Sequence, residues 1–334
     1  MMRVALVGCG NMGAALAGGL ERLASRMTVT ATADTDLESA KSLAARFKGA
    51  RALRDYRDAL DLADAVLLAT PHDAHHAMGM ECLAAGKHVF MEKPLANTER
   101  ECLDLIKASE EAGRVLMVGY CMRFHPLVQK VKELIESKAY GDVFQASIWT
   151  EQLTLREAGH WMLSAAALGG GQLFSHGCHY VDLLLWFLGR PLSGVHFGTN
   201  YGTPWMEREG TSNVCIEFAG GPLGYHFGTW GARGTRLGYA IHAHCTGGMI
   251  EAQIREGRLL ALTKEGESVL IEGEKGKQVE RELEHFADCV ESGKPPLTDG
   301  RGSLQGLRVI WRLYEAEERG GLADLSGCGL DEIG

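Results

Sequence analysis

The sequence predicts an α/β protein of two domains: a doubly wound parallel sheet at the N-terminus, then an α+β domain with a large, open, mostly antiparallel sheet. The chain has 334 residues, which exceeds the ~250–300 residues at which a single core stops growing. Strand-like and helix-like segments alternate over the first part, as in parallel sheets. Short β-rich runs then crowd together, as in antiparallel sheets. We expect the domains at residues 1–120 and 121–334.

The first domain is expected to alternate short, apolar strands with helices. The strands fall at Arg3–Val7, Thr28–Ala33, Ala65–Ala69, His88–Met91 and Val115–Val118. The helices fall at Met12–Leu23, Asp36–Phe47, Ala74–Ala85 and Thr98–Ala112, the last capped by Asn97 or Thr98. Strands that alternate with helices of this length indicate a parallel, doubly wound sheet.

The second domain is expected to combine an open sheet with helices on one face. Its first helices are Leu127–Ser137 and Ser175–Leu188, the latter ended by Gly189 and Pro191. The β-rich runs are Val195–Thr199, Ser212–Phe218, Leu223–Trp230, Leu237–His244, Met249–Arg255, Leu259–Leu262 and Ser268–Ile271. Two helices follow, at Val279–Ser292 and at about residues 302–318. We expect this last helix to pack back on the first domain.

The composition is that of an ordinary globular protein and excludes several classes. The net charge of −9 argues against nucleic acid and against an anionic membrane surface as partners. No apolar stretch approaches the ~20 residues of a membrane helix, and no targeting signal is recognised. The nine Cys are scattered without a Cys-x-x-Cys pair, which favours a reduced, cytoplasmic protein with buried thiols.

A glycine-rich turn, Gly8-Cys9-Gly10-Asn11-Met12-Gly13, joins the first strand to the first helix. Its spacing is typical of the Rossmann dinucleotide-binding fold. Gly8 permits the tight turn, Gly10 lets the backbone approach a pyrophosphate, and Gly13 lets helix and strand pack closely. The N-terminus of the helix offers N–H groups and partial positive charge to phosphates. We therefore expect NAD(P) on this turn, in contact also with Asn11 and Met12.

Asp34 favours NAD over NADP. It closes the second strand, 21 residues after Gly13. A carboxylate there accepts hydrogen bonds from the ribose hydroxyls and repels a 2′-phosphate, and no Arg occurs within Asp34-Thr35-Asp36. The alternative is that the glycines make a structural turn and that Asp34 only caps a helix.

Three later segments carry a resemblance to a known family. They are Thr70-Pro71-His72-Asp73-Ala74-His75, with Ala85-Gly86-Lys87-His88-Val89-Phe90-Met91-Glu92-Lys93-Pro94; Gly119-Tyr120-Cys121-Met122-Arg123-Phe124-His125-Pro126; and Gly169-Gly170-Gly171-Gln172-Leu173-Phe174-Ser175-His176-Gly177-Cys178-His179-Tyr180-Val181-Asp182. In order and spacing they resemble the glucose–fructose oxidoreductase, inositol dehydrogenase and MocA (Gfo/Idh/MocA) family. The Glu-Lys-Pro motif is the most specific of them. The resemblance runs from Arg3 to about Gly189 and continues loosely to the C-terminal helix.

The resemblance implies an oxidoreductase that transfers a hydride between NAD(P) and a hydroxyl-bearing carbon of a sugar, cyclitol or related polyol. Lys93 would be the family's lysine near the nicotinamide and the reacting oxygen, and the Lys93–Pro94 bond is often cis in relatives. His179 would be the active-site acid or base. The residues placed near the cofactor are Thr70, Pro71, His75, Glu92 and Lys93. The sheet of the second domain would mediate a homodimer or homotetramer.

One position departs from the family pattern. Many family dehydrogenases carry Asp where this chain has Ser175, four residues before His179. Ser cannot ionise at neutral pH, so Ser175 would hydrogen-bond the substrate or His179. Asp182 would orient His179 or pair elsewhere.

Other side chains are candidates for substrate binding. Arg123 would contact the cofactor or the substrate or form a structural salt bridge, and His176 lies beside the catalytic candidates. His160 and Trp161 precede the triple glycine and would line the pocket. His72, His75 and His76 are clustered, but no Cys or carboxylate spacing supports a metal site, and we expect none.

Two alternative functions remain open. Some relatives oxidise a sugar carbon transiently, eliminate a glycosidic substituent and reduce the carbon again, and the change at Ser175 keeps this possible. The chain would otherwise be an NAD-binding regulatory protein without catalysis, since fold alone does not establish function.

Overall fold

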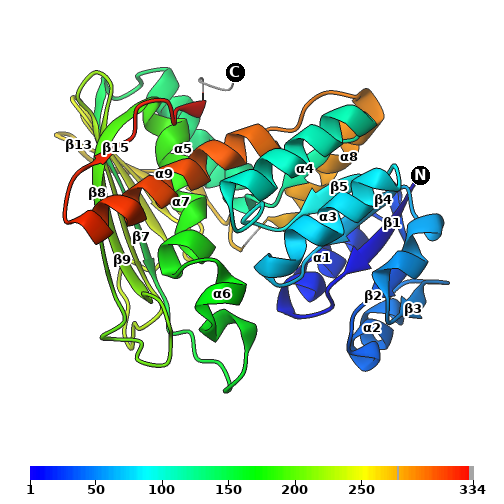
Figure 1. The fold of residues 1–334 in the computed structure, drawn as a ribbon. Coiled ribbons are helices and arrows are strands. Elements are labelled where there is room, and N and C mark those ends of the chain that lie inside the picture. Colours follow the sequence, from blue (N-terminus) through cyan, green and yellow to red (C-terminus); the bar gives the residue numbers. More distant parts are fainter. Residues whose placement is uncertain (277, 331–334) are drawn as a thin grey trace. The chain divides into compact units, whose positions relative to one another are not determined.

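The computed structural model describes residues 1–276 and 278–330, which form two compact units (Figure 1). The first unit contains Met1–Cys121 and Gln278–Leu304, and the second contains the rest of the described chain. The expected boundary near residue 120 leaves out this return of Gln278–Leu304 to the first unit.

The first unit is built on a six-stranded sheet in the order β3-β2-β1-β4-β5-β6. Every neighbouring pair is parallel. The strands are β1 (Met2–Val7), β2 (Met27–Ala33), β3 (Arg51–Leu53), β4 (Ala65–Leu68), β5 (His88–Met91) and β6 (Leu116–Val118). The strand order reverses at β1, so the doubly wound sheet is confirmed. β3 was not expected, because its three residues are too few to show a pattern.

The helices of the first unit connect these strands. They are α1 (Asn11–Arg22), α2 (Leu37–Ala44), α3 (His75–Ala84) and α4 (Glu99–Ala112), with the 3₁₀ turns η1 (Tyr56–Leu62) and η2 (His72–Ala74). Thr98 rather than Asn97 caps α4, through a capping box in which Thr98 and Glu101 bond each other's backbone N–H.

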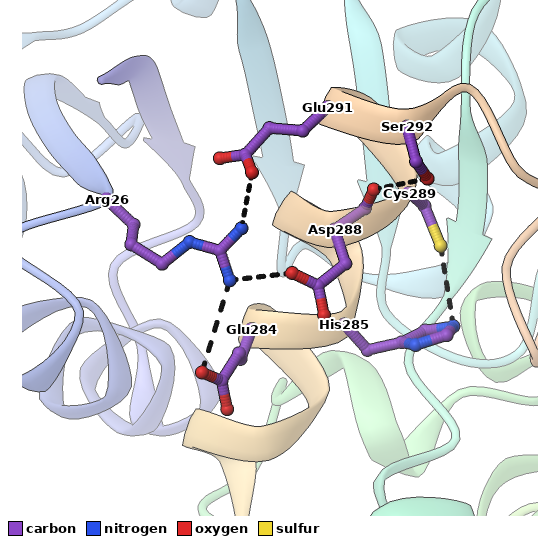
Figure 2. Close-up of polar contacts among 7 residues, drawn as sticks. All are labelled: Arg26, Glu284, His285, Asp288, Cys289, Glu291 and Ser292. Atoms are coloured by element: carbon purple, nitrogen blue, oxygen red, sulfur yellow. Dashed lines mark hydrogen bonds and ion pairs between the residues drawn. The ribbon is translucent and has the colours of Figure 1, made fainter.

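Helix α8 (Val279–Ser292) belongs to the first unit because it packs on α1. Gly19 of α1 permits this contact, since a Cβ there would lie 2.9 Å from the Leu283 side chain. Beyond α1, the Arg26 guanidinium lies 2.7 Å from Asp288 and from Glu291, and 4.0 Å from Glu284 (Figure 2). Helix α9 (Gly300–Arg319) is divided between the units: its first residues, up to Leu304, belong to the first unit.

The second unit is built on a nine-stranded sheet in the order β14-β13-β12-β11-β7-β10-β9-β8-β15. Its strands are β7 (Val143–Glu151), β8 (Pro191–Thr199), β9 (Thr211–Phe218), β10 (Leu223–Thr229), β11 (Ala240–Cys245), β12 (Gly248–Gln253), β13 (Arg258–Thr263), β14 (Gly266–Glu272) and β15 (Ala323–Asp324). Neighbours are antiparallel except for β7 and β10, which run parallel. The expected open, mostly antiparallel sheet is therefore confirmed, although the sequence analysis missed β7.

The helices of this unit include α5 (Pro126–Glu136), α6 (Ala165–Leu168) and α7 (Cys178–Leu188). Helix α7 is buried along most of its length and contacts β7 and β10, so it forms the centre of the core. The expected single helix from Ser175 is corrected: a π-helix, η5 (Leu173–Gly177), precedes α7. Among the described residues, no helix has both the length and the apolar character needed to cross a membrane.

Candidate active site

The glycines of the β1–α1 turn are required by close backbone approaches. Gly8 has φ +88°, and a Cβ there would lie 2.3 Å from the Ala69 carbonyl oxygen. A Cβ on Gly13 would lie 2.0 Å from the Gly8 carbonyl oxygen. Gly10, by contrast, faces open space, with no heavy atom within 4 Å of a Cβ built there. The turn is thus tight on its inner side and open on the side from which a ligand would approach.

The N-terminus of α1 is suited to an anion. Gly10 is its N-cap, no side chain caps the helix, and the first turn carries no acidic residue. The first N–H groups of a helix have no partner within it, and here they lie at the positive end of the dipole, next to the exposed Gly10 and Asn11. This arrangement fits the pyrophosphate of a dinucleotide.

Asp34 joins two turns at the end of β2. One carboxylate oxygen accepts from the Cys9 N–H at 2.7 Å and the other from the Asp36 N–H at 2.9 Å. Asp36, not Asp34, caps α2, so the helix-cap alternative for Asp34 does not hold. Burial and the nearby carboxylates of Asp34 and Asp36 raise the pKa of the Cys9 thiol to about 12.

Arg54 is a cation that the sequence analysis did not consider. It follows β3 and donates to the Thr35 carbonyl oxygen at 2.8 Å. Its charge also contributes to lowering the pKa of Asp36, after hydrogen bonds from Ser39 and Glu38. A guanidinium therefore lies beside the loop that follows Asp34.

His75 connects the two loops that carry the other cofactor candidates. Its buried ring lies 2.8 Å from the Pro94 carbonyl oxygen and 3.1 Å from the Thr70 carbonyl oxygen. Burial lowers the pKa of His75. The ring therefore positions the loop with Thr70 and Pro71 and the loop with Lys93, whose bond to Pro94 is cis.

Glu92 lies directly before this lysine and is buried. Its carboxylate accepts from the Lys93 N–H at 3.3 Å. A Cβ on Gly119 would lie 3.1 Å from the Glu92 carboxyl group, so Gly119 leaves the space that Glu92 occupies. Among the expected cofactor residues, the structure brings Thr70, His75 and the Lys93 loop into contact.

The catalytic candidates of the second unit lie on η5 and the start of α7. Ser175 and His179 are both buried, and the Ser175 N–H donates to the Gly171 carbonyl oxygen at 3.0 Å. The rings of His176 and His179 meet edge to face at 6.3 Å between centroids. The second unit thus holds Ser175, His176 and His179 together, while Lys93 belongs to the first unit.

His176 belongs to a polar network. The Tyr239 hydroxyl donates to Gln152 Oε1 at 2.5 Å and lies 3.3 Å from His176 Nε2. The Gln172 amide nitrogen lies 3.4 Å from His176 Nδ1. Because Gln172 donates and the Tyr239 oxygen accepts, the neutral tautomer with hydrogen on Nε2 satisfies both contacts. Tyr239 has φ +61°, a backbone conformation that non-glycine residues rarely adopt.

Arg123 and Asp182 form a buried ion pair with two hydrogen bonds of 2.7 Å each. The guanidinium also lies over the Trp186 ring, 4.7 Å from its centroid. This is the structural salt bridge that the sequence left open as the alternative to a substrate contact. Asp182 accordingly pairs with Arg123, and we do not assign Arg123 to the substrate.

His160 and Trp161 lie at the short 3₁₀ turn η4 (Trp161–Leu163). His160 caps it by accepting from the Met162 N–H at 3.1 Å, and its ring stacks on Trp161. Burial lowers the pKa of His160, and the charge of Arg156 adds to this. Trp161 packs against a small core around Trp230. No group of three or more potential metal ligands occurs in the part of the chain that the structure describes.

Comparison with known families gives a match to both units. Residues 2–120 match the NAD-binding Rossmann domain of the oxidoreductase family, and residues 128–251 match the GFO/IDH/MocA C-terminal domain. The chain belongs to the GFO/IDH/MocA oxidoreductase family. The resemblance carried by the Glu92-Lys93-Pro94 and Ser175–Asp182 segments is thereby confirmed.

Curated GFO/IDH/MocA relatives include dehydrogenases of sugars and cyclitols. Inositol 2-dehydrogenase 2 of Saccharopolyspora erythraea is 32% identical over 227 residues, 66% of this chain and 65% of that protein. An NADP⁺ D-xylose 1-dehydrogenase of Haloarcula marismortui is 26% identical over 283 residues, 78% of this chain and 74% of that protein. The match covers less than two thirds of the first relatives: 65% of the first and 40% of an inositol 2-dehydrogenase of Rhodococcus jostii.

Solved structures share the fold over nearly the whole chain. Levoglucosan dehydrogenase in complex with NADH and levoglucosan gives a TM-score of 0.88 at 20% identity, covering 97% of this chain and 98% of that one. The WlbA dehydrogenase from Bordetella pertussis, in complex with NADH and UDP-GlcNAcA, gives 0.80 at 24% identity, with 97% and 98% covered. At these identities the comparison establishes the fold alone.

Proposed function

We propose that this family member is an NAD-dependent dehydrogenase or reductase that acts on a CH–OH group of a sugar, cyclitol or related polyol. The observation that carries the proposal is the uncapped, open N-terminus of α1 behind the tight Gly8–Gly13 contact. It fits a dinucleotide phosphate. The names of the inositol and xylose dehydrogenases among the relatives support the substrate class.

We propose NAD rather than NADP as the preferred cofactor. The carboxylate of Asp34 would accept hydrogen bonds from the adenosine ribose and repel a 2′-phosphate. The Arg54 guanidinium, which donates to the carbonyl oxygen of the neighbouring Thr35, would reduce that repulsion without removing the carboxylate. Titration with both cofactors should therefore give tighter binding of NAD, and the difference should shrink or reverse in Asp34→Ser.

Lys93 and His179 are the residues to which we assign the proton chemistry. When bound, the nicotinamide ring supplies the two-electron acceptor for oxidation of the carbon. The Lys93 ammonium would stabilise negative charge on the substrate oxygen. His179 would hold the hydroxyl proton, since imidazole exchanges protons near neutral pH. Ser175 would contribute a hydrogen bond, because its hydroxyl does not ionise at neutral pH.

Substrate recognition is assigned to polar and aromatic side chains of the second unit. A polyol presents many hydroxyl groups, each of which needs a donor or an acceptor when it is buried. His176 and its Tyr239 partner offer both kinds of group. His160 and Trp161 would add a stacked aromatic surface of the kind that packs on the apolar face of a sugar ring.

We propose a homo-oligomer, dimer or tetramer, that forms through the open face of the nine-stranded sheet. Trp149, Phe227, Asn213 and Phe197 pair in one row across adjacent strands and so share a face. Phe197 is 70% exposed, and large exposed aromatic groups on such a face are typical of interfaces. Phe197→Glu should lower the mass measured by light scattering if this face is the contact. We also propose a cytoplasmic location, since eight of the nine thiols are buried.

The test is turnover of the purified protein with NAD and a panel of sugars, inositols and other polyols. Net NADH formation with at least one member is the expected result. Cofactor that remains bound through purification, with glycoside cleavage but no net NADH, would instead support redox-assisted elimination. NAD binding without turnover of either kind, in either direction, would contradict the enzymatic proposal.

A further inference from the structure

The triple glycine Gly169-Gly170-Gly171 leads into the π-helix η5, whose first turn is capped in an unusual way. Four successive N–H groups open this turn, and they belong to Gly171, Gln172, Leu173 and Phe174. No side chain of the turn itself caps it. Since the first N–H groups of a helix lack partners within the helix, these four need acceptors from elsewhere.

Two residues distant in sequence supply all four acceptors. The Tyr314 hydroxyl of α9 accepts from Gly171 and from Phe174, at 3.2 Å each. Glu209, just before β9, accepts from Gln172 through its backbone carbonyl at 2.7 Å and from Leu173 through its carboxylate at 3.3 Å. The Tyr314 hydroxyl donates its own hydrogen to Glu209 Oε1 at 2.6 Å, which ties the two acceptors together.

The glycines are required for this cap to form. A Cβ on Gly171 would lie 2.0 Å from Glu209 Oε2, and one on Gly170 would lie 2.5 Å from the Phe174 Cβ. Glu209 itself packs over Gly198, where a Cβ would lie 2.8 Å from its side chain. The sequence around η5 is therefore shaped to bring the Glu209 carboxylate against the backbone.

The electrostatic setting of the cap combines opposing effects on the Glu209 carboxylate. Burial raises the pKa of Glu209, while the Tyr314 hydrogen bond, the charge of His196 and the Leu173 N–H oppose the rise. The Arg208 guanidinium lies over the Tyr314 ring at 5.4 Å, and His196 pairs with Glu317 at 2.7 Å. A carboxylate at a helix N-terminus also interacts favourably with the helix dipole.

We propose that Glu209 and Tyr314 are positioning residues, which hold η5 and thereby set the place of Ser175, His176 and His179. These three side chains follow the capped turn directly. The expected effect of the cap on turnover rests on the function proposed above. The expected effect of the cap on the order of the η5 backbone does not.

Amide exchange in Tyr314→Phe tests the cap without an activity measurement. The variant lacks one oxygen, which accepts from two N–H groups and donates to the Glu209 carboxylate. We expect amide exchange in the segment 171–177 to become at least about tenfold faster, which corresponds to about 1.4 kcal/mol. Tyr56→Phe is the matched control: it deletes the same atom from another Tyr–Glu pair, with Glu81, also at 2.6 Å. Unchanged protection of 171–177 in Tyr314→Phe would overturn the proposal.

Kinetics separates positioning from mere stability. Measured where each variant is fully folded, Tyr314→Phe should lower kcat about tenfold and leave the Kd for NAD unchanged, because the cap holds the catalytic side chains and lies outside the glycine turn. Glu209→Gln, which keeps an acceptor oxygen, should retain more of kcat than Glu209→Ala. A lower Tm with wild-type kcat in Tyr314→Phe would show that the network is only structural.

A double-mutant cycle of Gly171→Ala and Glu209→Ala tests the cap independently. Gly171→Ala places a methyl group where the Glu209 carboxylate lies, so it should cost about as much kcat as Glu209→Ala. The double variant should then be no worse than either single variant, because both changes remove the same cap. Losses that multiply would contradict a shared mechanism. If the wild-type protein turns over no polyol, the proposed function fails, and amide exchange alone still decides the cap.

Discussion

At the scale of the residue, Lys93 is held in place by a loop that a buried ring supports. His75 contacts the Pro94 and Thr70 carbonyl oxygens together, and burial lowers its pKa. The ring is therefore a neutral support for the loop rather than a charged group beside the cofactor.

Replacement of Lys93 by Met should abolish most of the turnover and spare the cofactor. We expect kcat to fall about 10²-fold to 10⁴-fold, the usual size of lost charge stabilisation or proton transfer. The Kd for NAD should stay within about threefold of the wild-type value, since the turn at Gly8–Gly13 is untouched. Lys87→Met, six residues upstream, is the control and should be silent. Equal activity of the two variants would exclude a role for Lys93.

The pH dependence of stability should report His226. Burial lowers its pKa from 6.5 to about 4, so between these values the unfolded chain binds a proton that the folded chain does not. The free energy of unfolding therefore falls as pH drops below 6.5, by about 2 kcal/mol at about pH 5 from this group. In His226→Gln the loss between neutral pH and pH 5, measured by chemical denaturation, should be smaller by that amount. An identical pH slope in both proteins would contradict the assignment.

Residue roles that depend on local geometry could be predicted from the sequence, and those that depend on distant partners could not. The positions of the glycine turn and Asp34 follow from spacing alone, because both lie within one strand–helix–strand unit of the sequence. The cap of η5 escaped the analysis, since Tyr314 lies 105 residues from Glu209. Arg123 remained ambiguous for the same reason: its partner Asp182 is 59 residues away.

At the scale of the element, the turn before α1 is the part most sensitive to small changes. Gly13→Ala would place a methyl group 2.0 Å from the Gly8 carbonyl oxygen, so strand and helix must separate there. We expect the affinity for NAD, measured by calorimetry, to fall at least about tenfold, a loss of ~1.4 kcal/mol.

Gly18→Ala is the matched control for this change. Gly18 lies on the same helix, and the nearest atom to a Cβ there is the end of the Arg46 side chain at 3.8 Å. The Gly18→Ala variant should bind NAD normally, and its free energy of unfolding should rise by about 0.5–1 kcal/mol. Equal losses of affinity in both variants would mean that helix propensity, and not the close contact, sets the geometry of the turn.

The contact between Arg26 and α8 should contribute modestly to stability (Figure 2). The acidic partners Glu284, Asp288 and Glu291 are more than half exposed, so solvent screens each pair. Arg26→Gln should lower the free energy of unfolding by about 0.5–1 kcal/mol at low salt and by less at high salt. A loss that does not change with salt would show that packing of the side chain, rather than charge, is responsible.

Most elements could be placed from the sequence to within a few residues, because apolar periodicity and capping residues act locally. Helix α8 was expected at its observed bounds. Strand β7 was missed, although apolar and polar residues alternate within Val143–Glu151. This strand occupies the middle of the second sheet. The π-helix could not be expected, since the N–H groups of its first turn depend on acceptors from Glu209 and Tyr314 that only the folded chain brings there.

At the scale of the whole molecule, each unit has its own core, and the chain passes between the units more than once. Gln278–Leu304 returns to the first unit because α8 packs on Gly19. No local pattern indicates this, since the residues in contact are more than 250 positions apart along the chain. The fold class was nevertheless predictable, because alternation of strands and helices and the glycine turn are properties of short segments.

In the proposed reaction a hydrogen passes directly from an alcohol carbon of the substrate to the cofactor. The most direct measurement uses a polyol found active in the panel, deuterated at the carbon that is oxidised, and determines the mass of the NADH formed. Direct transfer predicts one deuterium per NADH, with a slower rate than for the unlabelled substrate when this step limits turnover. NADH without deuterium, or label lost to solvent, would contradict it.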